Sequence, residues 1–187
     1  LVLVARSEEG LNRVRGIIAG KHSASIVVIP LDLSQPGSTK ALIDELSARS
    51  LTPDVVVNNA GFGLVGKAAE LSVDQQLNMN DLNSRALTDI SLRVLPAMLG
   101  RKSGGIINVA SVAAFLPGPN MAVYFATKAF VVSFSDALHE EVRGSGVNVM
   151  SLCPGPAETG CQFRAGMKDA RRLSPTKLPS AASVAAL

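Results

Sequence analysis

The chain has 187 residues, enough for one domain with a sizeable core, and its 47% apolar and 18% charged residues exclude a disordered or fibrous protein. Its net charge of +3 comes from scattered basic residues that are not interleaved with aromatic ones, so no nucleic-acid partner is predicted. No apolar run approaches the roughly 20 residues that span a bilayer. We therefore expect no membrane association and a reducing, cytoplasmic setting, with Cys153 as a buried thiol.

Five short apolar runs predict β-strands. Each run is nearly continuous rather than alternating, which is typical of parallel strands buried on both faces. The runs cover residues 1–5, 25–31, 54–58, 105–110 and 147–152.

Helical patterns lie between these runs. Ser7 is a candidate N-cap for the first helix, and further helices are predicted over 36–49, 81–99 and 122–143. Pro96 should kink or end the third of these helices. Strands and helices that alternate in this way predict an α/β fold, a doubly wound parallel sheet with right-handed crossovers.

Tyr124 and Lys128 stand four residues apart in a predicted helix, so both side chains lie on one face. An ammonium beside a phenol favours the phenolate, and so lowers the pKa of the tyrosine from its usual value of about 10. Such a tyrosine can donate a proton to a carbonyl oxygen or accept one from an alcohol. Ser111 ends the fourth apolar run, at a strand end where α/β folds place their chemistry, and its hydroxyl can hold a substrate oxygen.

Each of these residues also has a structural interpretation. Tyr–Lys pairs occur on many helices, and a serine after a strand often forms a turn or a cap. The combination favours catalysis, because Tyr124 is the only tyrosine in the chain and follows a loop rich in proline and glycine, 116–119.

In their order and spacing these residues resemble the short-chain dehydrogenase/reductase family over the whole chain. The matching motifs are Asn58-Asn59-Ala60-Gly61, Ser111, Tyr124-x-x-x-Lys128, Pro154-Gly155-Pro156 and Thr159. The resemblance implies one Rossmann-like domain over residues 1–187 that transfers a hydride between NADP(H) and a carbonyl or alcohol substrate. It implies that Ser111, Tyr124 and Lys128 are catalytic. An asparagine in the preceding helix completes the family's proton relay; Asn83 matches that position here, and Asn80 competes with it.

The end of the first apolar run bears on the choice of cofactor. An acidic residue there would bind the adenosine ribose and repel a 2′-phosphate, whereas Arg6 fits a phosphate, unless it is an ordinary surface residue. The sequence therefore favours NADP(H) over NAD(H). The resemblance implies that Asp32, which could also simply form a turn, contacts the adenine. The other cofactor contacts that it implies are Asn59, Ala60, Gly61, Tyr124, Lys128, Pro154, Gly155 and Thr159.

Two motifs point elsewhere. Residues 61–66 match Gly-x-Gly-x-x-Gly, but that fingerprint needs a helix opening at its third glycine, and we expect only a loop. His139 begins a pattern that resembles a zinc helix, but Arg143 stands where the second histidine is needed, so no metal site is predicted. A hydrolase is a distant alternative, because no serine stands on a nucleophile elbow.

The family's opening strand and glycine-rich turn, which binds the pyrophosphate at a helix N-terminus, do not occur in this sequence. We therefore expect a chain that is incomplete at both ends and that, by itself, binds NADPH weakly or not at all and is inactive. The same departure leaves open a second function, a non-catalytic nucleotide-binding or interaction protein of the same fold. The family often pairs its two long helices between subunits, which implies a homodimer or homotetramer. The stretches 112–121 and 157–172 are expected to line the substrate pocket, and the small and apolar residues among them favour a neutral carbonyl compound.

Overall fold

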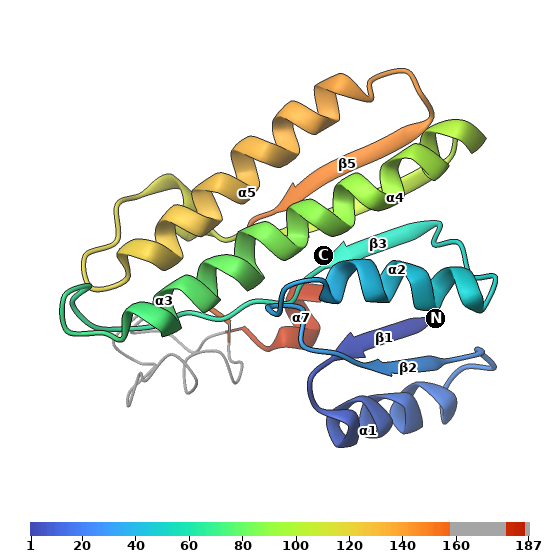
Figure 1. Cartoon of the computed structure of the whole chain (residues 1–187), viewed down its shortest axis with the longest axis horizontal. Coiled ribbons are helices and arrows are strands. Elements are labelled where there is room, and N and C mark those ends of the chain that lie inside the picture. The colour runs from blue at the N-terminus through green and yellow to red at the C-terminus, as the bar shows by residue number, and fades with distance from the viewer. Residues whose placement is uncertain (158–178, 186–187) are drawn as a thin grey trace. The chain divides into compact units, whose positions relative to one another are not determined.

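The computed structural model describes residues 1–157 and 179–185. Residues 1–52 form one compact unit, and the described residues from 53 onward form a second. Each unit contains parallel strands joined by helices (Figure 1), so the predicted α/β fold class is confirmed. The assignment of one domain over the whole chain stays a prediction.

The first unit is a strand–helix–strand motif followed by a helix. Strand β1 (Val2–Ala5) pairs in parallel with β2 (Val27–Pro30), and α1 (Glu8–Ala19) connects them. Ser7 caps α1 as predicted: its hydroxyl accepts a hydrogen bond from the Gly10 N–H at 3.0 Å. Helix α2 (Ser38–Ala48) follows β2.

The second unit is built on a parallel sheet in the order β3-β4-β5. These strands are β3 (Val55–Asn58), β4 (Gly104–Val109) and β5 (Val147–Leu152). Asn58 lies opposite Asn108, and Val109 lies opposite Leu152. The carboxyl ends of all three strands therefore meet at one edge of the sheet, where α/β proteins bind their ligands.

The long helix before β4 begins earlier than the sequence predicts. It consists of α3 (Val73–Asn80), a π-helical turn η1 (Asp81–Ala86) and α4 (Leu87–Arg101). The prediction that Pro96 could end this helix is wrong. Pro96 lies on the exposed side, so water can satisfy the carbonyl whose partner the proline removes, and the helix continues to Arg101.

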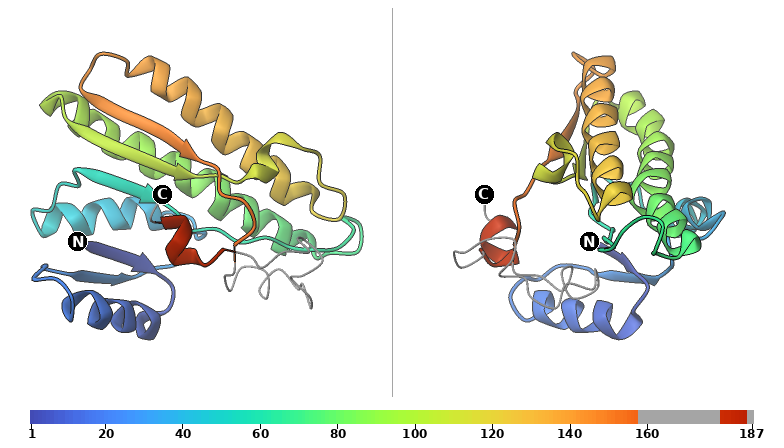
Figure 2. Two further views of the ribbon diagram at one scale, coloured as in Figure 1. Left: turned by 180° about the vertical axis from the view of Figure 1, so that it is seen from behind. Right: turned by 90° about the vertical axis from the view of Figure 1, so that its left-hand side faces the viewer.

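Helices α4 and α5 (Ala122–Glu141) cover one face of this sheet, as the end-on view in Figure 2 shows. Ile106 of β4 and Val131 of α5 are completely buried between these layers. A 3₁₀ turn, η2 (Val112–Phe115), leads from β4 toward α5, and a short helix, α7 (Ala181–Ala185), follows the undescribed stretch. None of the described helices has the length and apolar character to cross a membrane.

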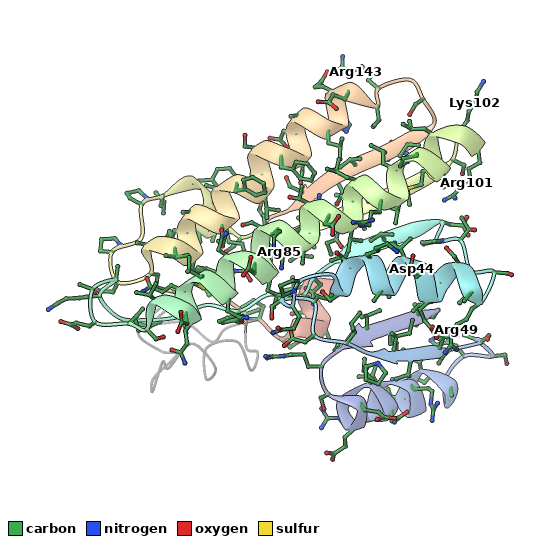
Figure 3. The ribbon with its side chains drawn as sticks, in the orientation of Figure 1. Asp44, Arg49, Arg85, Arg101, Lys102 and Arg143 are labelled. Atoms are coloured by element: carbon green, nitrogen blue, oxygen red, sulfur yellow. The ribbon has the colours of Figure 1, made fainter. Side chains whose placement is uncertain are left out.

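The amino edge of the sheet is held by one arginine. The Arg101 side chain, labelled in Figure 3, donates hydrogen bonds to the carbonyl oxygens of Pro53 at 2.6 Å and Ser103 at 2.7 Å. Gly146 comes so close to the Lys102 carbonyl that any side chain there would overlap it, and its φ of 84° also favours glycine. The end of α4 is therefore fixed against the starts of all three strands.

Candidate active site

The segments that follow β3, β4 and β5 form the candidate site at the carboxyl edge of the sheet. Asn59, Ala60 and Gly61 after β3 are exposed, so they can meet a ligand. Gly155 after β5 is exposed too, and a Cβ added to it would have no atom within 4 Å. Thr159 lies outside the described residues, as does the predicted lining stretch beyond 157.

Ser111 stands directly between β4 and η2. Its hydroxyl accepts a hydrogen bond from the Ala113 N–H at 3.2 Å, as an N-cap, and donates one to the Pro154 carbonyl at 3.4 Å. The Val112 N–H donates to the same carbonyl at 3.1 Å. Ser111 therefore caps η2 and connects the ends of β4 and β5 by a hydrogen bond. The residue is half-buried, and it lies at the carboxyl edge of the sheet.

Tyr124 and Lys128 lie on successive turns near the start of α5. Lys128 is buried, at 7% exposure, and its ammonium donates a hydrogen bond to the Val109 carbonyl of β4 at 2.7 Å. It also lies 5.9 Å from the centroid of the Tyr124 ring. A Cβ on Gly63 would lie only 3.3 Å from the Tyr124 ring, so the absence of a side chain lets the loop after β3 approach the tyrosine.

Asn83 lies in the π-helical turn and is 1% exposed. Its side-chain oxygen accepts from the Phe62 N–H at 3.1 Å, and its amide donates to the Phe62 carbonyl at 2.9 Å. Asn80, the competing residue, is exposed. The structure thus brings Asn83, and not Asn80, to the loop after β3; π-helical turns of this kind are frequent at functional sites.

Thr127 is a site residue that sequence reasoning missed. Its buried hydroxyl accepts from the Asn83 amide at 3.1 Å and donates to the Tyr124 carbonyl at 2.7 Å. The loop at Phe62, Asn83 and the first turns of α5 are therefore joined by one chain of hydrogen bonds. The only signal in the sequence was a hydroxyl residue inside the Tyr-x-x-x-Lys motif, between its two functional side chains.

Arg6 and Asp32 belong to the first unit. Arg6 is exposed and follows β1, and Asp32 follows β2, where its carboxylate accepts hydrogen bonds from the Ser34 N–H at 3.0 Å and the Ser34 hydroxyl at 2.7 Å. Burial, the largest single effect, raises the pKa of Asp32, but the bonds from Ser34, the charge of Arg6 and a bond from Gln35 outweigh it. The pKa of Asp32 therefore lies below its ordinary value of 3.8.

The other sequence motifs have structural explanations. No helix opens at Gly66, since α3 begins only at Val73, so the predicted loop is confirmed. His139 is exposed on α5, and its Nδ1 lies 2.9 Å from the Val149 carbonyl oxygen. Cys153 carries a free thiol that is half-buried rather than fully buried, because it lies at the rim of the cluster formed by Leu87, Ala110 and Val131.

Comparison with known proteins agrees with this arrangement. The family model described as short chain dehydrogenase matches residues 1–169, and the chain belongs to this family. It is 30% identical over 181 residues to an uncharacterised oxidoreductase of Staphylococcus aureus, covering 97% of this chain and 77% of that protein. This chain is therefore an oxidoreductase of the short-chain dehydrogenase type.

Two solved structures share the fold. One is a short-chain dehydrogenase from Sphingobium yanoikuyae in complex with NADPH, with a TM-score of 0.90 and 29% identity over 100% of this chain and 72% of that one. The other, described as a putative NAD(P)-dependent gluconate 5-dehydrogenase from Beutenbergia cavernae with bound NADP, has a TM-score of 0.81 and 31% identity over 95% of this chain and 72% of that one.

Proposed function

We propose that this enzyme transfers a hydride between NADP(H) and a neutral carbonyl or alcohol substrate, with Tyr124 as the acid and base. The observation that carries the proposal is the buried Lys128 ammonium, hydrogen-bonded to Val109 two residues before Ser111 and 5.9 Å from the Tyr124 ring. This geometry supplies a positive charge beside the only phenol of the chain, on a helix that packs against η2, the turn that Ser111 caps.

In the reduction, the Ser111 hydroxyl donates a hydrogen bond to the substrate carbonyl oxygen and holds it near Tyr124. NADPH supplies the hydride that forms the new C–H bond. Tyr124 gives its phenolic proton to the developing alkoxide, so the products are an alcohol, NADP⁺ and a tyrosinate. The Lys128 ammonium stabilises that tyrosinate until solvent returns a proton.

Asn83 and Thr127 support this step in the proposal. Both are buried, and their hydrogen bonds connect the Phe62 backbone to the Tyr124 backbone. Asn83 and Lys128 both lie beside Gly61, where an added Cβ would be 2.9 Å from the Asn83 side-chain oxygen and 3.8 Å from the Lys128 nitrogen. In the proposal, the second lone pair of that oxygen holds a water through which a proton returns to Lys128 and Tyr124.

The residues at the carboxyl edge fit a nicotinamide dinucleotide. Asn59, Ala60 and Gly61 expose a short backbone segment, and Gly155 leaves open space where a side chain would otherwise project. In the first unit, Arg6 immediately precedes the N-terminus of α1, and both its charge and the helix dipole favour a phosphate. Glu8 and Glu9 in the first turn of α1 oppose this effect, so Arg6 has the leading role in the proposed preference for NADP(H).

The substrate class follows from the side chains around Ser111 and Tyr124. Between Lys102 and Lys128 the sequence contains no charged residue and no histidine. Val112 and Phe115 of η2 are exposed at 44% and 64%, directly after Ser111. An apolar surface without a fixed charge favours an uncharged, hydrophobic carbonyl compound over a keto acid.

The first test is Tyr124→Phe in the full-length enzyme, which removes only the phenolic oxygen. NADPH oxidation is followed with an aromatic ketone, an aliphatic ketone and a keto acid, and NADPH affinity is measured separately by nicotinamide fluorescence. We expect turnover to fall at least a hundredfold, the range of general acid catalysis, with NADPH affinity unchanged. A variant that keeps a tenth of the wild-type rate would refute the role of Tyr124. NADPH binding by the wild-type protein without turnover of any carbonyl would favour the non-catalytic alternative.

The second test is Arg6→Asp, which replaces the proposed phosphate partner with a repelling charge. The ratio of kcat/KM for NADPH to that for NADH should fall by at least about tenfold, since a charge-assisted phosphate contact is worth about 1.5–3 kcal/mol and repulsion adds to the loss. Arg13→Asp, on the exposed part of α1, is the matched control for a change of charge. An unchanged cofactor ratio in Arg6→Asp would show that other residues select the phosphate.

We also propose that the enzyme is a homodimer or homotetramer that pairs α4 and α5 between subunits. Leu92 on α4 and Phe130 on α5 are 50% and 44% exposed, and Phe130 stacks on Phe134 with ring centroids 6.0 Å apart. Apolar side chains on two adjacent helices form a surface suited to a second copy. Light scattering tests this proposal: Phe130→Glu should lower the assembly state, whereas a wild-type monomer would refute it.

A further inference from the structure

Besides the hydrogen-bonded side chains of the candidate active site, a group of four polar side chains lies in the core of the second unit. Asn58 is 9% exposed, and Asn108, Ser91 and Ser135 are completely buried. The Asn58 amide donates to the Ser91 hydroxyl at 3.1 Å and to the Asn108 side-chain oxygen at 2.9 Å. The Asn108 amide in turn donates to the Ser135 hydroxyl at 2.9 Å.

These hydrogen bonds cross the second unit from one helix to the other. Ser91 belongs to α4, Asn58 and Asn108 are register partners in β3 and β4, and Ser135 belongs to α5. Each serine also donates to the carbonyl four residues earlier in its own helix, at 2.8 Å for Ser91 and 2.7 Å for Ser135. The chain of hydrogen bonds is therefore complete at both ends.

The link between Asn108 and Ser135 joins the two elements that carry the proposed chemistry. Asn108 lies three residues before Ser111 on β4, and Ser135 lies seven residues after Lys128 on α5. Seven residues are about two helical turns, so Ser135 and Lys128 lie on the same side of α5. Strand β4 and helix α5 are thus joined by two polar contacts, Lys128 to Val109 and Asn108 to Ser135.

Apolar side chains in place of Asn108 and Ser135 could also fill the interface between β4 and α5, and they would avoid the free-energy cost of removing an amide and a hydroxyl from water. Replacement of a buried polar group by an apolar group of similar shape is often neutral or stabilising, so stability is a poor explanation for this pair. A hydrogen bond, however, is directional, whereas apolar contacts tolerate sliding. A slip of α5 by one residue moves it about 1.5 Å along its axis and would break the bond between Asn108 and Ser135.

We propose that Asn108 and Ser135 are positioning residues that hold α5 in register on β4, and so set the separation of the Ser111 hydroxyl and the Tyr124 phenol. The proposal rests on the catalytic roles proposed above for Ser111 and Tyr124. Neither Asn108 nor Ser135 touches substrate or cofactor. Their effect passes through the geometry of the two elements.

The test is Ser135→Ala in the otherwise unchanged enzyme, with the best ketone of the panel as substrate. We expect kcat to fall about tenfold, within the range of up to about a hundredfold that a 1 Å misplacement costs. The ketone KM and the NADPH dissociation constant should stay within twofold of wild type. Ser135→Cys fills the same space with a weaker hydrogen-bonding group, so it should also lower kcat even if Ser135→Ala does not fold.

Ser91→Ala is the matched control. Like Ser135→Ala, this substitution removes a serine hydroxyl at a completely buried position, and it leaves an asparagine amide, that of Asn58, without this acceptor. Ser91, however, lies on α4, away from the interface between β4 and α5. The melting temperature of Ser91→Ala should fall as in Ser135→Ala, while its kcat stays within threefold of wild type. Equal losses of kcat in both variants, or a wild-type kcat in Ser135→Ala or Ser135→Cys, would overturn the positioning role. Tyr124→Phe is run in parallel, because its activity reports separately on the proposed function.

Discussion

Gly61→Ala should destabilise the second unit through one contact. A Cβ at this position would lie 2.9 Å from the Asn83 side-chain oxygen and 3.6 Å from its Cγ. Carbon and oxygen atoms that are not hydrogen-bonded rarely come so close, so either the loop or the Asn83 amide has to move. The loop itself is tied to Asn83 through both backbone groups of Phe62.

The size of the effect follows from these two alternatives. If the Asn83 amide turns away, it loses up to three hydrogen bonds, to the Phe62 N–H, the Phe62 carbonyl and Thr127, each worth about 1 kcal/mol net. If the loop yields instead, overpacking costs about 1–3 kcal/mol. Both alternatives predict a loss of about 1–3 kcal/mol in the free energy of unfolding.

Thermal and urea unfolding without cofactor measure this loss, and Gly155→Ala is the matched control because its added Cβ meets no atom within 4 Å. We expect a melting temperature about 2–12 °C lower for Gly61→Ala and no loss for Gly155→Ala. In the Asn83→Ala background, where the opposing amide is gone, Gly61→Ala should add almost nothing. Additive losses in the double variant, or a Gly61→Ala protein as stable as wild type, would contradict the predicted contact.

Three further changes probe other parts of the structure. Thr127→Val keeps the shape of the side chain but removes the hydroxyl between Asn83 and the Tyr124 carbonyl, so the free energy of unfolding should fall by about 1–3 kcal/mol. An unchanged denaturation midpoint would count against a stabilising role of these two hydrogen bonds. Pro96→Ala should raise the melting temperature, because α4 already passes through this exposed position and alanine restores a helical N–H; a lower value would mean that proline is needed there. Asp32→Asn should lower the free energy of unfolding at neutral pH, because the depressed pKa of Asp32 stabilises the fold at pH values above its unfolded-state pKa. The difference in stability between variant and wild type should vanish as the pH falls through the folded-state pKa of Asp32, which lies below 3.8. A difference that persisted at that pH would have another cause.

The sequence predicts the strands of this protein well, because each is short, contains several valine, isoleucine or leucine residues, and is bounded by polar or turn-forming residues. Helix α3 was not predicted, because residues 73–80 are polar on most sides and only Met79 is buried. The prediction therefore began that helix at 81, inside the observed helical segment.

In the candidate site, features that depend on nearby residues could be predicted from the sequence, and contacts between distant residues could not. Tyr124 and Lys128 share a helix face, which their spacing alone predicts. The choice between Asn83 and Asn80 could not be made from spacing, because a π-helical turn changes the register of the side chains that follow it. The contacts of Asn83 with Phe62 and Thr127 span 21 and 44 residues of sequence, so periodicity contains no trace of them.

Because Lys128 is buried, its chemical reactivity can report on local separation of α5 from β4. The residue is 7% exposed and its ammonium donates to the Val109 carbonyl, so an acylating reagent can reach the amine only when α5 separates from the end of β4. Most other lysines of the described chain, such as Lys40 and Lys67, have side chains that are 63% and 72% exposed and should react at once. The slow modification of this one lysine, followed by peptide mass mapping, would therefore report how often the wall of the site opens in the native enzyme.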